Sequence, residues 1–334
     1  MAKTPDWDSR IGRRVTLRDL HILFAVAQHG SMAKAGVHLG KSQSAASQAV
    51  AAIEHAVGVR LLDRTSRGVQ PTTYGNVLLR RGRAAFDELK LGVDEIEYLV
   101  DPAIGEVRIA CSELVAGGVL PAIIDRLSSQ YPRIKLHVLE AGSMITECPE
   151  LQERKVDLRL AFLSPQFAGD LAKSKEFDAE ILYNDQICLA VGAASRWARR
   201  RKIDLAELAD ERWVAPPFAA SGGMAIMEAF RARGLPPPQI SITTTSLGLR
   251  NFLIKSGHFI VALPHSIAEL YADHFALKRL PIKFPTQIPY AMITLKNRAL
   301  SPAAERFIEC AREIAKSVAG NPQMSKSRQK SRLG

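Results

Sequence analysis

The sequence predicts three parts: an N-terminal winged helix-turn-helix, a long linker helix and a C-terminal α/β domain of two lobes. Residues 17–72 contain three segments with helical patterns and capping residues, followed by a short hairpin. Residues 73–100 form one uninterrupted helical pattern. From residue 106 onward strand-like runs alternate with helical stretches, which is typical of an α/β domain with a largely parallel sheet.

The first two helices are marked by residues that begin and end helices. Apolar residues recur at intervals of three and four over 17–29, which predicts a helix with one buried stripe. Gly30 ends this helix, and Ser31 is placed to cap a second one over 32–39. Two short helices joined by a tight turn are typical of a helix-turn-helix, although any helical core can contain such a pair.

The third helix, predicted over about 43–57 with Ser42 as its cap, has two faces of different chemistry. One face is an apolar stripe with helical spacing, formed by Ala46, Val50, Ile53 and Val57. Another arc near the helix N-terminus holds hydroxyl and amide side chains: Gln43, Ser44, Ser47 and Gln48. This arc suits a recognition helix in the DNA major groove, because Gln can pair with adenine and Ser with a base or a phosphate. A solvated helix face is the alternative.

A short hairpin is predicted over 59–72, where β-forming residues flank a Ser-Arg-Gly tip. Three helices followed by a hairpin are the order of a winged helix-turn-helix. Arg64 and Arg67 bracket the tip, where they are placed to contact phosphates or to enter a minor groove. Solvated hairpin charges are the alternative for both residues.

The net charge of +11 is unevenly distributed along the 334 residues. Residues 10–83 contain 12 Lys or Arg against 3 Asp or Glu, a net of +9. Residues 84–320 have a net charge of −1, and the tail over 321–334 has a net charge of +4. A basic N-terminal block suits a polyanion as partner, such as the double-stranded DNA that the predicted recognition helix would bind. A charged, merely soluble surface is the alternative. The tail has almost no apolar residue and is predicted to be disordered.

A single long helix is predicted over 73–100, capped by Thr72 and ended by Asp101-Pro102. Apolar residues recur in it with heptad spacing: Phe86, Leu89, Val93, Ile96 and Val100. This pattern favours a seam between two copies of the helix, and the first four residues are the predicted dimerisation residues. Because the pattern covers only about two heptads, packing of the helix on its own domain is the alternative.

Strand-like runs in the C-terminal region alternate with helices, and the first helix is expected over 113–130. The runs cover 107–112, 134–142, 156–163, 180–192, 212–218, 239–246 and 259–264. A weak internal similarity between 107–121 and 240–264 indicates two similar lobes. We therefore predict these divisions: 16–73 for the winged helix-turn-helix, 74–101 for the linker helix, 105–320 for the α/β domain, with one lobe at about 105–163 and 285–320 and the other at about 164–284.

Several classes of protein are disfavoured by the composition. The four cysteines are far apart and form no Cys-x-x-Cys pattern, so we expect a reduced cytoplasmic chain without metal or cofactor. No apolar run approaches the ~20 residues that span a bilayer, and the first residues carry no signal-peptide segment, so no membrane partner is expected. An enzyme with Cys111 as a strand-end nucleophile is an alternative, but no Gly-x-Ser-x-Gly motif or Cys–His pattern supports it.

Residues 17–75 resemble the DNA-binding domain of LysR-type transcriptional regulators, in "LRDLHILFAVAQHGSMAKA" and "SQSAASQAVAAIEHAVGVRLLDRTSRGVQPTTYG". The stretches "GEVRIACSELVAGGVLPAIIDRLSSQYPRIKLHVLEAG" and "FLIKSGHFIVALP" are similar to that family's effector-binding domain. The resemblance implies a homo-oligomer, usually a dimer of dimers, and a small-molecule effector between two periplasmic-binding-protein-like lobes. It also implies DNA contacts from the recognition helix, the wing and the preceding helix: Gln43, Ser44, Ser47, Gln48, Arg64, Ser31 and Lys34.

The same resemblance implies effector contacts from hydroxyl side chains that follow strands. The candidates are Ser112, Ser143, Ser164, Ser221, Thr245 and Ser246. Because backbone N–H groups and a hydroxyl at a helix N-terminus suit an anion, we expect a carboxylate-bearing effector. Plain N-caps are the alternative for each of these residues.

Some residues depart from those common in the family and leave the base preference open: Lys41, Ser44, Ala46 and Gln48. Gly36 stands where the family usually has Ala, although Gly is about 1 kcal/mol less favourable in a helix. An architectural DNA binder without a small-molecule response is a further alternative, which the long α/β region disfavours.

Overall fold

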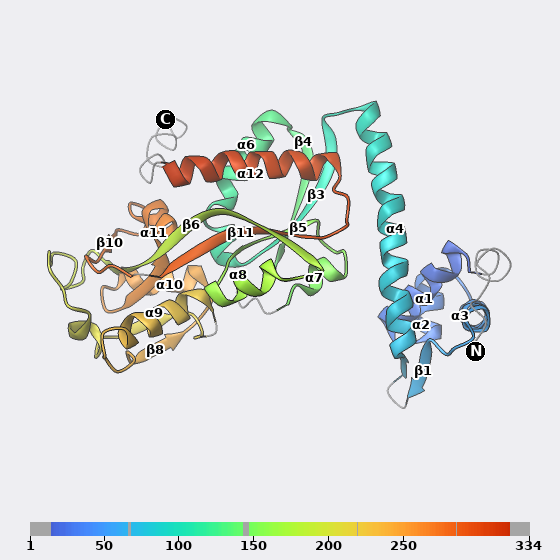
Figure 1. Ribbon diagram of the computed structural model, residues 1–334, viewed down its shortest axis with the longest axis horizontal. Coiled ribbons are helices and arrows are strands. Elements are labelled where there is room, and N and C mark those ends of the chain that lie inside the picture. Colours follow the sequence, from blue (N-terminus) through green and yellow to red (C-terminus); the bar gives the residue numbers. More distant parts are fainter. Residues whose placement is uncertain (1–14, 66–67, 143–146, 219, 285, 321–334) are drawn as a thin grey trace. The chain divides into compact units, whose positions relative to one another are not determined.

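The computed structural model describes residues 15–65, 68–142, 147–218, 220–284 and 286–320. The chain forms two compact units, residues 1–93 and 94–334, each of which is described by itself (Figure 1). Three of the sequence predictions fall outside the described residues: Arg67, Ser143 and the tail over 321–334.

The N-terminal unit is a three-helix cluster with a two-stranded wing, and the long helix α4 begins in it (Figure 1). Its elements are α1 (Leu17–His29), α2 (Met32–His38), α3 (Gln43–Val57), β1 (Leu62–Thr65), β2 (Gly68–Pro71) and α4 (Thr73–Val100). The three helices therefore begin where the sequence predicted, and the hairpin begins three residues later and ends one residue earlier than predicted.

Capping explains why the helices of this unit have these limits. Thr16 and Asp19 form a capping box at the start of α1, and Gly30 ends that helix with a φ of 62°. Ser31 and Ser42 each accept a backbone N–H bond at the starts of α2 and α3. The helices pack around a core that includes Leu23. The predicted winged helix-turn-helix is confirmed.

The C-terminal unit is built on a mixed sheet whose path is β4-β3-β5-β11-β6-β9-β7-β8, with β10 paired to β6. Its strands are β3 (Ile104–Cys111), β4 (Arg133–Glu140), β5 (Leu158–Phe162), β6 (Phe177–Gly192), β7 (Trp213–Ala215), β8 (Ile240–Thr243), β9 (Ile260–Pro264), β10 (Leu277–Arg279) and β11 (Gln287–Leu295).

The strand order contains the same arrangement twice, which defines two lobes. In the first lobe β3 lies between β4 and β5, both parallel to it, and β11 pairs antiparallel to β5. In the second lobe β7 lies between β8 and β9, both parallel to it, and β6 pairs antiparallel to β9. The long strands β6 and β11 pair with each other and so join the lobes. The predicted two-lobed α/β domain is confirmed.

Helices cover both faces of this sheet. They are α5 (Glu113–Ala116), α6 (Leu120–Gln130), α7 (Pro149–Gln152), α8 (Pro165–Ala172), α9 (Ser221–Arg231), α10 (Leu247–Lys255), α11 (His265–Tyr271), α12 (Pro302–Gly320) and the 3-10 turn η2 (Leu205–Leu208). Figure 1 shows α12 and α6 on one side of the first lobe and α7 and α8 on the other, in agreement with their contacts. One apolar core runs through both lobes, and a smaller one lies beneath α7 and α8.

The structure corrects three predictions about this unit. The sheet is mixed rather than largely parallel, because β6, β10 and β11 run antiparallel to their neighbours, and β10 and β11 were not predicted. The helix predicted over 113–130 is interrupted at Gly117 and Gly118. The internal sequence similarity also matched the wrong strands. It aligned β3 with β8, whereas the strand that takes the position of β3 in the second lobe is β7.

Candidate nucleic-acid interface and inter-lobe cleft

The polar arc of α3 faces solvent while the opposite face of the helix is buried. Gln43, Ser44 and Gln48 are exposed, and Ser47 is half-buried. The buried face comprises Ala46, Ala49, Val50, Ile53 and Ala56. Val57, which the sequence placed in this stripe, is only half-buried. The side chains of Gln43, Ser44 and Gln48 are thus accessible to a partner.

The hydroxyl of Ser44 is partly occupied by the cap of its own helix. Its Oγ lies 2.9 Å from Oγ of Ser42, which accepts the Ala45 N–H at 3.1 Å. Ser31 plays the same capping part in α2, where its Oγ accepts the Lys34 N–H at 3.4 Å. A capping serine can still donate its hydroxyl hydrogen, so capping and a phosphate contact are compatible. The Lys34 side chain is exposed.

Gly36 is explained by the close turn between α2 and α3. The Lys41 N–H donates to the Gly36 carbonyl at 2.7 Å, which folds residue 41 back onto the helix. A Cβ at position 36 would lie 2.8 Å from the Lys41 carbonyl oxygen and 3.2 Å from that of Ser42. Both neighbours are backbone atoms, so the turn has this form only with glycine at this position.

The wing is attached to the recognition helix by a residue that the sequence analysis did not single out. Oε1 of Glu54 accepts the backbone N–H groups of Leu61 at 2.7 Å and Leu62 at 3.2 Å. In the hairpin Arg64 is opposite Val69. The side chain of Arg64 lies outside the described residues, so its DNA contact stays a prediction, as does that of Arg67.

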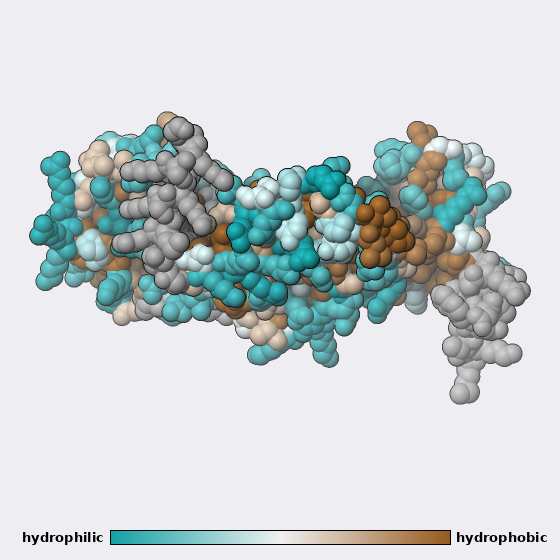
Figure 2. Space-filling view, turned by 90° about the horizontal axis from the view of Figure 1, so that it is seen from above, coloured by the Kyte–Doolittle hydropathy of each residue, from teal (hydrophilic) through white to brown (hydrophobic). Residues whose placement is uncertain are grey.

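The apolar stripe of α4 divides into a packed and an exposed part. The Phe86 ring packs edge-on against Phe24 and also contacts His21, with centroid distances of 5.4 and 6.0 Å. Leu89, Val93 and Ile96 are 53–63% exposed. Leu99 and Val100 continue the stripe, and Figure 2 shows hydrophobic side chains gathered at this end of the helix. Phe86 thus follows the packing alternative, whereas the other three present an apolar surface.

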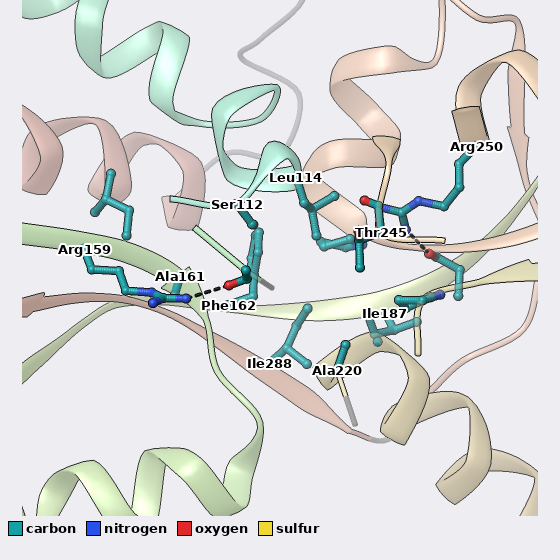
Figure 3. Close-up of a pocket in the computed structure, with 16 residues that line it drawn as sticks. Ser112, Leu114, Arg159, Ala161, Phe162, Ile187, Ala220, Thr245, Arg250 and Ile288 are labelled. Atoms are coloured by element: carbon teal, nitrogen blue, oxygen red, sulfur yellow. Dashed lines mark hydrogen bonds between the residues drawn. The ribbon is translucent and has the colours of Figure 1, made fainter. Parts of the chain in front are cut away.

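A cavity lies between the lobes at the ends of β3, β5 and β9 (Figure 3). Ser112 and Thr245, two of the predicted effector contacts, line it. The rest of the lining is mainly apolar and includes Leu114, Phe162, Ile187 and Ile288. Its volume is about 40 Å³, far below the ~300–1,000 Å³ of pockets that hold small-molecule ligands. A metabolite would therefore enter only if the lobes moved apart.

Arg250 of α10 lines this cavity and is only 3% exposed. Among the described residues, its guanidinium donates only long bonds to carbonyl oxygens, at 3.4 Å to Ser246 and at 3.5 Å to Thr245 and Ala262. Burial lowers the pKa of Arg250 to about 10, opposed by the charge of Glu113. No carboxylate among the described residues forms an ion pair with it, and the charge of Glu113 acts on it from beyond ion-pair distance and from outside the cavity lining.

Arg159 of β5 is the second buried arginine in the lining, and Figure 3 shows it on the opposite side of the cavity. It forms an ion pair with Glu150 and donates to the Gly142 carbonyl at 2.6 Å. Its Nε has no partner within the described part of the chain. Glu150 balances its charge, so Arg250 alone gives the cavity a positive excess. Sequence reasoning missed both arginines, because only the fold shows that they are buried.

The remaining predicted effector residues differ in their placement. Ser246 caps α10 by accepting the Leu249 N–H at 3.2 Å, and its hydroxyl also donates to Glu113. Ser164 caps α8 and does not line the cavity, which fits the capping alternative. The side chain of Ser221 lies outside the described residues, although Ala220 and Gly222 line the cavity.

Cys111 does not have the character of a nucleophile. It is buried, and burial raises the pKa of its thiol to about 11, so it is neutral near pH 7. The other three cysteines are also free and buried. Within the described ranges no group of three or more His, Cys, Asp or Glu is arranged to hold a metal ion. None of the described helices combines the length and the apolar character required of a membrane span.

Two family models together match most of the chain. One, the bacterial regulatory helix-turn-helix protein of the lysR family, matches residues 17–76, and the other, the LysR substrate binding domain, matches residues 101–316. GbpR of Azospirillum brasilense is 25% identical over 303 residues, covering 90% of this chain and 86% of GbpR. GltC of Bacillus subtilis, a transcriptional dual regulator, is 26% identical over 294 residues, covering 88% of this chain and 95% of GltC.

Solved structures with the same fold include full-length CbnR complexed with its target DNA, at 21% identity and a TM-score of 0.52, covering 90% of this chain and 99% of that chain. A full-length OxyR variant from Pseudomonas aeruginosa has 18% identity and a TM-score of 0.63, covering 90% of this chain and 94% of that chain. The winged unit, the two-lobed sheet and the two family matches lead to one conclusion: the chain belongs to the LysR family of transcriptional regulators.

Proposed function

We propose that this regulator binds operator DNA as an oligomer and responds to a small anionic effector held between its two lobes. The observation that carries the anionic effector is Arg250, a buried cation in the cleft lining with no ion-paired carboxylate among the described residues. A buried charge without a close counter-charge is costly, so an anion is favoured beside it.

Arg250 and the cleft hydroxyls would divide the recognition of such an effector. The planar guanidinium can donate two parallel bonds to a carboxylate. Ser112 and Thr245 approach from the two lobes and can donate or accept hydrogen bonds. The apolar lining suits a short hydrocarbon body. Since the cavity has a volume of about 40 Å³, effector binding requires a change in lobe separation, which is the step that would be transmitted to the DNA-binding unit.

For DNA, we propose that the exposed arc of α3 contacts bases and that the wing and α2 contact phosphates. Gln43, Ser44, Ser47 and Gln48 supply the base-facing groups. Ser31, Lys34, Arg64 and Arg67 supply the phosphate contacts. We propose a cytoplasmic location, because a regulator must reach promoter DNA.

We propose that two copies associate through the exposed stripe of α4, formed by Leu89, Val93 and Ile96. These side chains follow heptad spacing on one helix, and more than half of each is left exposed by the part of the chain that the structure describes, which is unfavourable in water. A dimer of dimers follows from the family resemblance.

The effector proposal is tested by replacing Arg250 and screening small carboxylates and their neutral amides by thermal shift at constant ionic strength. We expect at least one carboxylate to raise the Tm of the wild-type protein and to change its operator footprint. Arg250→Gln should lose both effects, and Arg250→Lys, which keeps the charge, should retain part of them. Equal stabilisation of wild type and Arg250→Gln by a neutral compound would contradict the proposal.

A further inference from the structure

A carboxylate of the first lobe accepts hydrogen bonds from the start of a helix in the second lobe and so links the two lobes. Glu113 is the first residue of α5, next to Ser112 in the first lobe. Its Oε2 accepts the Leu247 N–H at 3.0 Å, and its Oε1 accepts the Gly248 N–H at 3.0 Å. The Ser246 hydroxyl adds a longer bond to Oε1, at 3.4 Å.

These donors form the N-terminus of α10, a nine-residue helix with Ser246 as its cap. The first N–H groups of a helix have no partner in the helix, and the helix dipole favours negative charge beside them. The sequence predicted this place as the seat of an effector anion. The structure shows that a carboxylate of the protein already occupies it.

The contact belongs to a close seam between the lobes. The Tyr271 hydroxyl of α11 donates to the Gly117 carbonyl at 2.5 Å. A Cβ at Gly117 would lie 2.8 Å from Leu247 Cδ2, and one at Gly118 would lie 2.2 Å from Ile267 Cδ1. Gly117 and Gly118 therefore approach α10 and α11 as closely as they do because neither has a side chain. Separating the lobes would break the Glu113 bonds.

Helix α10 also connects the Glu113 contact at its start to the cleft. Arg250 lies one turn after Ser246, lines the cavity and is buried. Glu113 itself is not part of the cavity lining, but its neighbours Ser112 and Leu114 are. An anion at the start of α10 and an anion beside Arg250 would thus both be stabilised by the dipole of α10 and by the positive charge of Arg250.

We propose that Glu113 is an internal anion that holds the lobes together in the absence of effector and competes with an anionic effector for the Leu247 and Gly248 N–H groups. The first part rests on the contacts alone. The second part rests on the proposed function, because it requires an anionic effector. When the lobes part to admit that effector, its carboxylate, which Arg250 also attracts, replaces Glu113 at the helix.

The first part is tested without effector by removing the carboxylate and restoring it from solution. In full-length Glu113→Ala we expect the 246–250 amides to lose hydrogen-exchange protection by at least about tenfold, because two charge-assisted bonds are absent. Acetate should restore protection, and acetamide, which has the same shape but no charge, should not. Glu153→Ala, which removes an exposed carboxylate paired with Lys155, is the matched control and should leave these amides unchanged.

Two results would overturn the first part. One is unchanged protection of 246–250 in Glu113→Ala. The other is equal restoration of protection by acetate and acetamide. That result would show that filling the space left by the side chain, and not the negative charge, restores protection. Glu113→Gln keeps the size of the side chain and so controls for a folding defect caused by the smaller alanine. We expect the 246–250 amides to have intermediate protection in this variant.

The competition is tested with benzoate as the probe, titrated at constant ionic strength and followed by calorimetry. We expect Glu113→Gln to bind benzoate about tenfold more tightly than the wild type, the effect of removing one competing charged hydrogen bond. Equal or weaker binding by Glu113→Gln would contradict the competition. If benzoate binds neither protein, the competition is refuted for this ligand, and the anionic-effector proposal loses support. The acetate experiment still tests, independently, whether Glu113 holds the lobes together.

Discussion

The ring of Phe86 lies edge-on to the ring of Phe24, with 5.4 Å between their centroids, and this contact divides the apolar stripe of α4. Phe86 stabilises the N-terminal unit, whereas Leu89, one turn further along, is 53% exposed. Two residues of one heptad pattern therefore have different roles, and substitutions can separate them.

Leu89→Asp is expected to dissociate the oligomer and weaken operator binding together, because a charge would enter the apolar seam. Sedimentation measures the first effect and footprinting the second. Phe86→Ala should instead lower the Tm of the N-terminal unit through lost packing and leave the oligomer intact. A Leu89→Asp protein that still binds DNA as a dimer would show that the seam lies elsewhere.

Gln43→Ala is expected to weaken binding to the operator while nonspecific binding changes little. The exposed amide can make a bidentate contact with adenine, and such a contact discriminates by about 1–3 kcal/mol. Competition gel shifts with operator and random DNA measure the difference. Lys34→Ala serves as the contrast, since loss of a phosphate contact should weaken both complexes alike. Equal losses from Gln43→Ala would refute base recognition by this residue.

Arg64→Ala is expected to lower the dependence of DNA affinity on salt. Each phosphate contact contributes about 0.9 to the slope of log affinity against log salt concentration, so the slope should fall by about one unit. Titrations at four or more salt concentrations give the slope. Were it unchanged, Arg64 would make no phosphate contact.

Gly36→Ala is expected to destabilise the protein although alanine is the better helix former. The added Cβ would lie 2.8 Å from the Lys41 carbonyl oxygen, and overpacking of this kind costs about 1–3 kcal/mol. Gly92→Ala in α4 is the matched control, because nothing lies within 4 Å of its Cβ position, and it should gain up to about 1 kcal/mol. Thermal unfolding compares the two, and equal Tm changes would contradict the close turn.

Cys111 is expected to resist thiol reagents in the folded protein at pH 8, because burial raises its pKa to about 11 and blocks access. The raised pKa of Cys111 also determines how the free energy of unfolding changes with pH. Above about pH 9 the unfolded thiol loses its proton while the folded one keeps it, so the free energy of unfolding decreases as the pH rises. Colorimetric thiol titration with and without denaturant measures the reactivity. Rapid reaction of the folded Cys111 would contradict its burial.

The local features of the N-terminal unit were predictable from the sequence because they depend on neighbouring residues. Ser31, Gly30 and Ser42 act through bonds to atoms three or four residues away, so their positions alone locate the helix ends. The exposed arc of α3 likewise follows from helical periodicity. Gly36 is the exception, because its requirement arises from the way the turn folds back onto the helix.

The C-terminal unit was predictable only in outline. Alternating strands and helices indicated an α/β domain, but β11 was missed, and with it the antiparallel pairing with β6 that joins the lobes. Pairing between residues more than a hundred positions apart leaves no periodic trace in either strand. Arg159 and Arg250 were missed for a related reason, since burial of an arginine depends on what packs around it.

By itself the sequence determined the kind of protein, a capped helix-turn-helix with a basic block followed by a two-lobed α/β region, since those features depend on short-range hydrogen bonding and on composition. Only the tertiary structure decided which groups meet between the lobes. Glu113 and Leu247 are 134 residues apart, and their contact exists because the sheet brings the end of β3 beside the start of α10. An effector contact at the start of α10 stays a prediction, and in the structure the carboxylate of Glu113 lies there.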